Sequence, residues 1–83
     1  MTGTTWTGNE TLDGYDRLSF QFNAGGRAVM SDKDGNTQGT WSATGNNVTL
    51  RFDIIAYRGT IQGNRIQGTA TNGKSQWNWT VMK

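Results

Sequence analysis

The chain has 83 residues and a net charge of +2, with 12 glycines and no proline, cysteine or histidine. A chain of this length makes one small domain, because it buries only about 60–65% of the surface that its unfolded form exposes. The composition excludes a disulfide framework, a thiolate metal site and a histidine general base, and the nearly balanced charge argues against a nucleic-acid partner.

Strand signals recur about every ten residues along the chain, separated by Gly-Gly, Asp-Gly, Gly-Asn and Asn-Gly turns. No segment places apolar residues at helical spacing over three turns. The sequence therefore predicts an all-β domain. In chain order, its strands are expected at 4–9, 17–23, 27–33, 37–44, 47–53, 57–62, 65–71 and 74–82.

The pairing of the second and third predicted strands depends on the length of the loop between them. A two-residue glycine loop would set Phe22 opposite Val29 and turn Met30 outward. A three-residue loop over 24–26, with its last glycine left-handed, pairs Phe22 with Ala28 and keeps Met30 inside. We therefore predict the three-residue loop.

Three later hairpins are predicted to have two-residue loops, at Gly45-Asn46, Gly63-Asn64 and Asn72-Gly73. Each loop leaves one face of its hairpin apolar, as a one-sided antiparallel sheet requires. The predicted pairs are Trp41 with Leu50, Ile61 with Ile66, and Gly68 with Trp77.

Sequential hairpins that share one apolar face are most simply buried by closing the sheet into a small eight-stranded up-and-down barrel. Closure also removes the sheet edges that favour aggregation. A flattened barrel or a two-sheet sandwich is the alternative. The predicted core is Trp6, Leu18, Phe20, Phe22, Met30, Trp41, Val48, Leu50, Phe52, Tyr57, Ile61, Ile66, Trp77, Trp79 and Val81.

The motifs "GTW" at 39–41 and "WNWTV" at 77–81, within a meander of strands, resemble the lipocalin/avidin superfamily. They are more similar to short lipocalin-like bacterial modules with repeats of the form GTW-x-x-x-GN-x-hydrophobic-T. The resemblance implies an antiparallel barrel that binds a small molecule at one open end. This chain is much shorter than those proteins and lacks their polar biotin ligands, so biotin binding is not expected.

Alternate connections of a meander lie at the same end of the barrel. The end that holds 10–16, 32–36, the apolar stretch 53–56 and 72–73 has the longest loops. It also gathers every acidic residue of the chain, while the termini and the shortest turns lie at the opposite end. These acids are Glu10, Asp13, Asp16, Asp32, Asp34 and Asp53.

We expect a ligand site at this acidic end, because aromatic walls with a few polar acceptors suit a sugar, a planar ring or a cation. The alternative is that the aspartates serve turns and the tryptophans fill the barrel. Inward-facing glycines at 39, 59 and 68 bear on this choice, since Trp41 and Trp77 either cover them, which we favour, or leave room for a guest. The candidate ligand-binding residues are Tyr15, Asp32, Trp41, Phe52, Tyr57, Ser75 and Trp77.

Two apolar residues in the 53–56 connection, Ile54 and Ile55, either plug the barrel end or form an interface between copies in a homo-oligomer. The stretch 32–36, "DKDGN", is interpreted as a turn rather than a calcium loop, because its glycine is one place early. The outward-facing arginines at 51, 58 and 65 are interpreted as a solvated face.

The sequence shows no nucleophile–base pair, so we expect a non-catalytic protein with no cofactor and no metal. No apolar run approaches the roughly 18 residues of a membrane span, and neither a membrane nor a nucleic-acid partner is expected. The start of the chain does not resemble a signal peptide, and the compartment stays open. The leading prediction is a small-molecule-binding module. The alternative is a structural or self-assembling interaction domain with a filled core.

Overall fold

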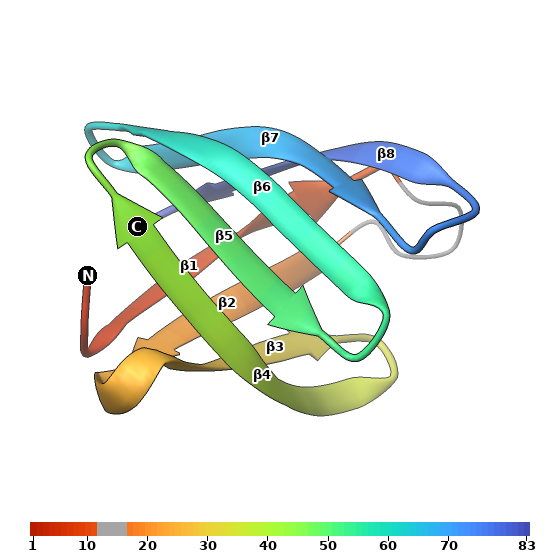
Figure 1. Ribbon diagram of the computed structural model, residues 1–83, viewed down its shortest axis with the longest axis horizontal. Helices are drawn as coiled ribbons and strands as arrows, with labels where there is room; N and C mark the ends of the chain where they lie inside the picture. The colour runs from red at the N-terminus through yellow and green to blue at the C-terminus, as the bar shows by residue number, and fades with distance from the viewer. Residues whose placement is uncertain (12–16) are drawn as a thin grey trace.

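The computed structural model describes residues 1–11 and 17–83. Within these residues, each strand pairs antiparallel with the next, and β8 returns to pair with β1, which closes a barrel (Figure 1). The predicted up-and-down barrel is confirmed, and the strand bounds agree with the predicted ones to within two residues. The strands are β1 (Thr4–Glu10), β2 (Arg17–Asn23), β3 (Arg27–Asp32), β4 (Gly35–Thr44), β5 (Asn47–Phe52), β6 (Ile55–Gln62), β7 (Arg65–Thr71) and β8 (Gln76–Met82).

The predicted three-residue connection between β2 and β3 is confirmed as a short 3₁₀ turn, Ala24–Gly26. It pairs Phe22 with Ala28, and Gly26 is left-handed, with φ of 72°. The two-residue loops at 45–46 and 63–64 are confirmed as well.

The β7–β8 turn is longer than predicted. Thr71 pairs with Gln76, so the turn has four residues, 72–75, and Gly68 pairs with Trp79 rather than with Trp77. The cause is Asn72, whose Oδ1 accepts hydrogen bonds from the backbone N–H groups of residues 74 and 75 and builds a wider turn. Because the register moves by two residues, the same side chains still face inward.

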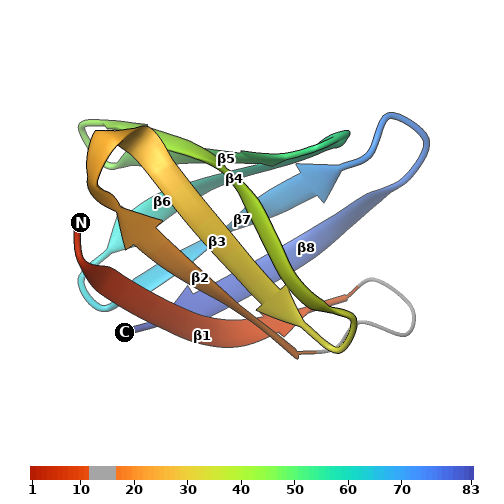
Figure 2. The ribbon, with the colours of Figure 1, turned by 90° about the horizontal axis from the view of Figure 1, so that it is seen from below.

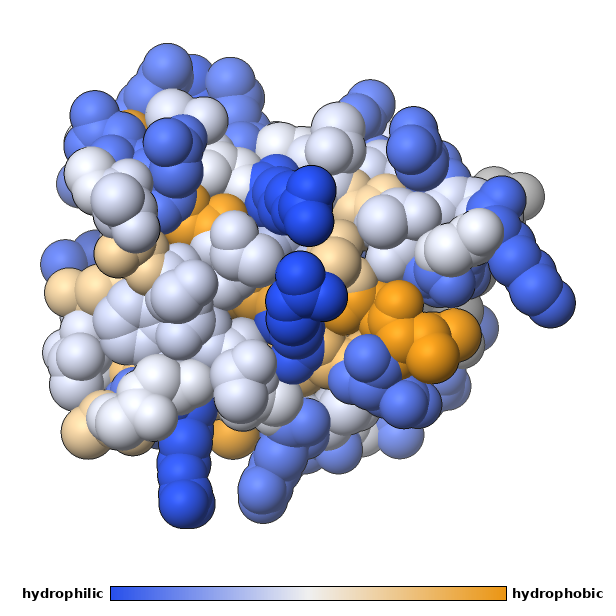
Figure 3. Space-filling model, in the orientation of Figure 1, coloured by the Kyte–Doolittle hydropathy of each residue, from blue (hydrophilic) through white to orange (hydrophobic). Residues whose placement is uncertain are grey.

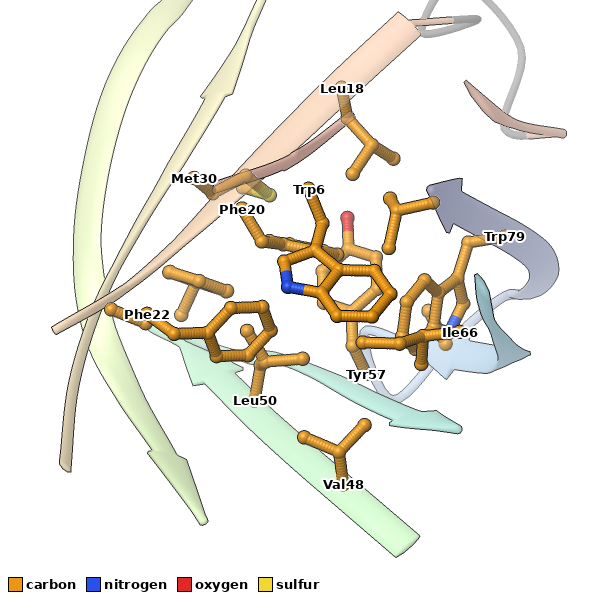
Figure 4. Packing of buried hydrophobic residues seen from close by; sticks show 14 of the residues in the cluster. Trp6, Leu18, Phe20, Phe22, Met30, Val48, Leu50, Tyr57, Ile66 and Trp79 are labelled. Atoms are coloured by element: carbon orange, nitrogen blue, oxygen red, sulfur yellow. The ribbon is translucent and has the colours of Figure 1, made fainter. Parts of the chain in front are cut away.

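Buried aromatic and aliphatic side chains from every strand except β4 fill the barrel (Figure 4), and β4 adds the partly buried Trp41. Phe20 lies near the centre, stacked on Phe52 at 5.7 Å and edge-to-face with Trp79 at 5.4 Å between ring centroids. The predicted core is confirmed except at Trp41 and Ile61, which are only partly buried. Ala28 and Ala70 are buried in addition.

The two ends of the barrel differ in what they carry. The termini, the 3₁₀ turn and the β4–β5 and β6–β7 turns lie at one end, on the left of Figures 1 and 2. The β3–β4, β5–β6 and β7–β8 turns lie at the other, which we call the loop-rich end. The register therefore gathers the turns that hold Asp34, Asp53 and Asn72 at one end of the molecule.

Candidate functional site

A cavity of about 370 Å³ occupies the loop-rich end. Its volume falls within the roughly 300–1,000 Å³ that is typical of small-molecule sites. A larger hollow of about 440 Å³ lies on the outer wall of β6–β8, where outward-facing Thr, Gln and Asn line most of it. The end cavity differs because five of its lining residues are buried, whereas Trp79 is the one buried residue of the outer hollow. Its lining is Glu10, Met30, Asp32, Asp34, Thr37, Phe52, Asp53, Ile54, Ile55, Tyr57, Asn72 and Trp77.

Glu10 is a buried acid at the inner part of this cavity, with 5% of its surface exposed. It faces inward because side chains alternate along a strand, and β1 already directs Trp6 and Gly8 to the interior. Its Oε1 accepts a hydrogen bond of 2.9 Å from the Tyr57 hydroxyl and one of 2.7 Å from Trp77 Nε1. Two strands thus fix the carboxylate in place.

Burial raises the pKa of Glu10 above its ordinary value, because a carboxylate loses hydration inside the barrel. The hydrogen bonds from Tyr57 and Trp77 oppose this effect, and the negative charge of Asp32 adds to it. Burial, together with Glu10, also raises the pKa of Tyr57. The Tyr57 hydroxyl therefore keeps its proton and remains a donor.

The second oxygen of Glu10 is directed at the cavity. Both donors to this carboxylate contact Oε1. Among the described residues, no fully buried polar side-chain atom lacks a hydrogen-bond partner. Since no residue of 1–11 or 17–83 donates to Oε2, and Glu10 lines the cavity, this oxygen is the one that an entering ligand can contact.

The rim of the cavity is acidic. Asp32, Asp34 and Asp53 join Glu10 in the lining. Asp32 Oδ1 accepts a 2.9 Å hydrogen bond from the Asp34 backbone N–H, as expected of the turn that the sequence predicts at 32–36. Asp53 has φ of 57°, a left-handed conformation that places it at the first position of a tight turn.

The structure brings four of the predicted ligand-binding residues together, since Asp32, Phe52, Tyr57 and Trp77 all line the cavity. Ser75 does not join them: it was predicted to face inward, but it is exposed in the β7–β8 turn, with its N–H bonded to Asn72. The predicted site residue Tyr15 lies outside the described residues.

Trp41 was predicted at the acidic end and lies at the opposite one. It is three residues from the β4–β5 turn, so the rise of the strand carries it to the end that holds the termini. There its Nε1 donates a 2.9 Å hydrogen bond to the Asn23 carbonyl. Its ring packs edge-to-face on Phe22 at 5.3 Å.

Rings cover two of the three inward-facing glycines, but not the rings that were predicted, and the atoms nearest to a Cβ on Gly68 belong to the backbone of β6. A Cβ on Gly39 would lie 2.5 Å from Cδ1 of Phe52, and one on Gly59 would lie 2.8 Å from Cζ2 of Trp79. Phe52 and Trp79, rather than Trp41 and Trp77, therefore fill the space that the glycines leave. Because Trp77 is not needed there, its indole is available to Glu10.

The predicted loop at 53–56 is a two-residue turn, because Phe52 pairs with Ile55. Ile54 is 70% exposed at its tip, whereas Ile55 is partly buried against the core. Figure 3 shows hydrophobic surface near the β5–β6 turn. Both isoleucines line the cavity, so each alternative predicted for them, a plug or an interface, concerns the rim of the candidate site.

The sequence placed Glu10 at the acidic end but not among the candidate ligand-binding residues, because the first strand was expected to end at residue 9. Alternation in "TWTGNE" was the available signal, since positions 6, 8 and 10 share a face. A lone acid at the end of a strand nevertheless suggests solvent exposure, and only the register of β6 and β8 brings its donors to it.

Two features are absent from residues 1–11 and 17–83. No three acidic side chains there converge as metal ligands. The same residues form no helix with the length and apolar character to cross a membrane. The chain matches no protein-family model, no curated protein and no solved structure. Its function has to be argued from this site.

Proposed function

We propose that the chain is a non-catalytic binding module that takes a small molecule into the cavity at the loop-rich end. The observation that carries this proposal is Glu10, a buried carboxylate with two donors on one oxygen and the other oxygen open to the cavity. A buried charge costs stability, and a barrel selected only for its core would be expected to place an apolar side chain there. Retaining such a charge beside an aromatic cavity is typical of a functional site.

The direction of the hydrogen bonds supports binding rather than catalysis. Tyr57 and Trp77 both donate to Glu10, and so they hold the carboxylate in place. General acid–base work would require one of these groups to exchange a proton with substrate. The raised pKa of Tyr57 makes its hydroxyl a poor proton source. A relationship to lipocalin/avidin-like modules, which the motifs at 39–41 and 77–81 suggest, is part of the same proposal and agrees with it.

The tryptophan indole N–H groups provide the test, because they report from different ends of the barrel. We expect a set of small aromatic fragments, including cationic, neutral and anionic compounds, to contain members that shift the Trp77 indole signal in ¹H–¹⁵N NMR spectra. The Trp41 signal is the internal control, since that indole lies at the opposite end. If no fragment at millimolar concentration shifts Trp77, or if Trp77 and Trp41 always shift together, the proposal is wrong.

The exposed Ile54 favours a second candidate function, self-assembly through the β5–β6 turn. An isoleucine that is 70% exposed beside an apolar rim is a suitable contact between copies. Sedimentation of the wild type and of Ile54→Asp tests this alternative. A concentration-dependent oligomer that Ile54→Asp dissociates would support it, and a wild type that stays monomeric at high concentration would exclude it.

A further inference from the structure

The charged side chains in the described lining of the cavity are all acidic. All four acids among the described residues, Glu10, Asp32, Asp34 and Asp53, line it. No lysine or arginine is part of the described lining, although the whole chain carries a net charge of +2. Several carboxylates around one cavity, with no basic residue in its described lining, favour a negative potential that attracts cations and repels anions.

Acceptors predominate among the hydrogen-bonding groups of the inner wall and the rim. The two donors at the inner wall, Tyr57 Oη and Trp77 Nε1, are already directed at Glu10. The other polar groups of the described lining are Glu10 Oε2 and the rim carboxylates, which accept, and the side chains of Thr37 and Asn72, which can donate as well as accept. A carboxylate or phosphate ligand would find repulsion here, and a ligand that supplies N–H donors would find partners.

The walls between these acceptors are aromatic. Tyr57 is edge-to-face with Phe52 at 6.1 Å and with Trp77 at 6.2 Å between ring centroids. All three residues line the cavity. Aromatic side chains bury the apolar body of a ligand and also attract a cation through their ring faces.

From these three observations we infer that the ligand is a small organic cation, an amine or guanidine on an apolar body, whose N–H group donates to Glu10 Oε2. This inference rests on the proposed function, because it names the ligand class of the same cavity. The body of the ligand lies against the aromatic wall, and the rim aspartates attract it from solvent. An organic cation fits better than a metal ion, because the described acids line the cavity without converging on one point.

Three probes of matched size test the inference: 2-phenylethylammonium, 2-phenylethanol and 3-phenylpropionate, titrated by calorimetry at low salt. We expect the ammonium to bind about 10- to 100-fold more tightly than the alcohol, as a hydrogen bond to a buried charged group provides. The propionate should bind most weakly. Tetramethylammonium, which has no N–H donor, should also bind more weakly than 2-phenylethylammonium.

Two substitutions distinguish the direct contact with Glu10 from the longer-range attraction by the rim aspartates. Glu10→Gln keeps the size of the side chain and an acceptor for Tyr57, and it should abolish the preference for the ammonium over the alcohol. Asp53→Asn is the matched control, because it removes the same charge at an exposed rim position and asparagine tolerates the left-handed backbone found there. It should weaken ammonium binding only modestly, in a way that added salt suppresses.

A second measurement on the wild type applies even if Glu10→Gln does not fold. Affinity for the ammonium should rise with pH as Glu10 loses its proton. The titratable groups that face Glu10 are Tyr57 on β6 and Asp32 on β3, with Asp34 and Asp53 in the turns across the cavity. Affinity that does not change with pH would contradict the role of Glu10.

The outcomes distinguish this inference from the proposal on which it rests. If the alcohol binds as tightly as the ammonium, and both shift the Trp77 indole signal, the cation inference is overturned while the binding function stands. If none of the probes binds and no other fragment shifts that signal, both fail together.

Discussion

At the scale of single residues, the arrangement of most consequence is a carboxylate held between a phenol and an indole. Glu10 comes from β1, Tyr57 from β6 and Trp77 from β8, so the contact joins parts of the chain far apart in sequence. A group buried in this way links folding to protonation. It also leaves one oxygen for a ligand.

Glu10 should make stability depend on pH. Its pKa is raised in the folded protein, so the folded state binds more protons than the unfolded state between the two pKa values. The free energy of unfolding should therefore fall as the pH rises from the pKa of Glu10 in the unfolded state through its pKa in the folded state. At higher pH the loss of stability should be complete and should no longer change. Chemical denaturation of the wild type and Glu10→Gln, from about pH 4 to about pH 7, should show a difference that grows with pH in favour of the variant.

Asp53→Asn is the control for that series, because it removes a carboxylate from the exposed rim. This variant should keep the pH profile of the wild type. A difference between the wild type and Glu10→Gln that is the same at every pH would contradict a raised pKa for Glu10.

At the scale of elements, glycines on neighbouring strands let the sheet curve tightly around its aromatic core. Gly59 pairs with Gly68, and the Trp79 ring lies over Gly59. Gly59→Ala would place a methyl group 2.8 Å from both the Gln67 carbonyl and Trp79 Cζ2. We expect it to lower the free energy of unfolding by about 1–3 kcal/mol, measured by urea denaturation.

An outward-facing residue of the same strand provides the comparison. Thr60 is exposed beside Gly59, and Thr60→Ala should change stability by less than about 0.5 kcal/mol. Equal effects of the two substitutions would mean that the space over Gly59 is not tightly filled.

Much of the barrel could be predicted from sequence because turn residues and alternation fix the register together. The glycine turn at 24–26 left one pairing that kept Met30 inside, and the structure has that pairing. The β7–β8 turn could not be predicted in the same way, because the side chain of Asn72 lengthens it.

The candidate site was harder to predict than the fold. Its position at the acidic end, with Asp32, followed from the order of the connections, and Phe52, Tyr57 and Trp77 followed from their inward direction. Trp41 was assigned to the wrong end because direction alone does not give height along the barrel. Glu10 was missed as a binding residue because its burial depends on donors from two distant strands.

At the scale of the whole molecule, closure depends on the seam between the first and last strands. The β1–β8 register runs from Thr7 with Met82 to Glu10 with Trp79, whereas the β6–β7 ladder runs from Ala56 with Thr71 to Gln62 with Arg65. The seam is the shorter ladder and joins the most distant parts of the chain, so opening it costs less than opening the β6–β7 hairpin.

Native-state hydrogen exchange should show this difference. Amides in the β1–β8 seam should exchange through openings of lower free energy than those of β6–β7. Because Glu10 and Trp77 lie on the two seam strands, 2-phenylethylammonium should raise protection there more than elsewhere. Uniform protection across the barrel, with and without the probe, would contradict this view of closure.

The ionisation of Glu10 itself tests the central claim most directly. The ¹³C signal of its carboxyl carbon, followed against pH by NMR, gives the pKa in the free protein and in the presence of 2-phenylethylammonium. We expect a pKa above the ordinary value in the free protein, because of burial, and a lower pKa with the probe, because a bound cation stabilises the carboxylate. An ordinary pKa that the probe does not change would mean that Glu10 is neither a buried charge nor the anchor of a ligand.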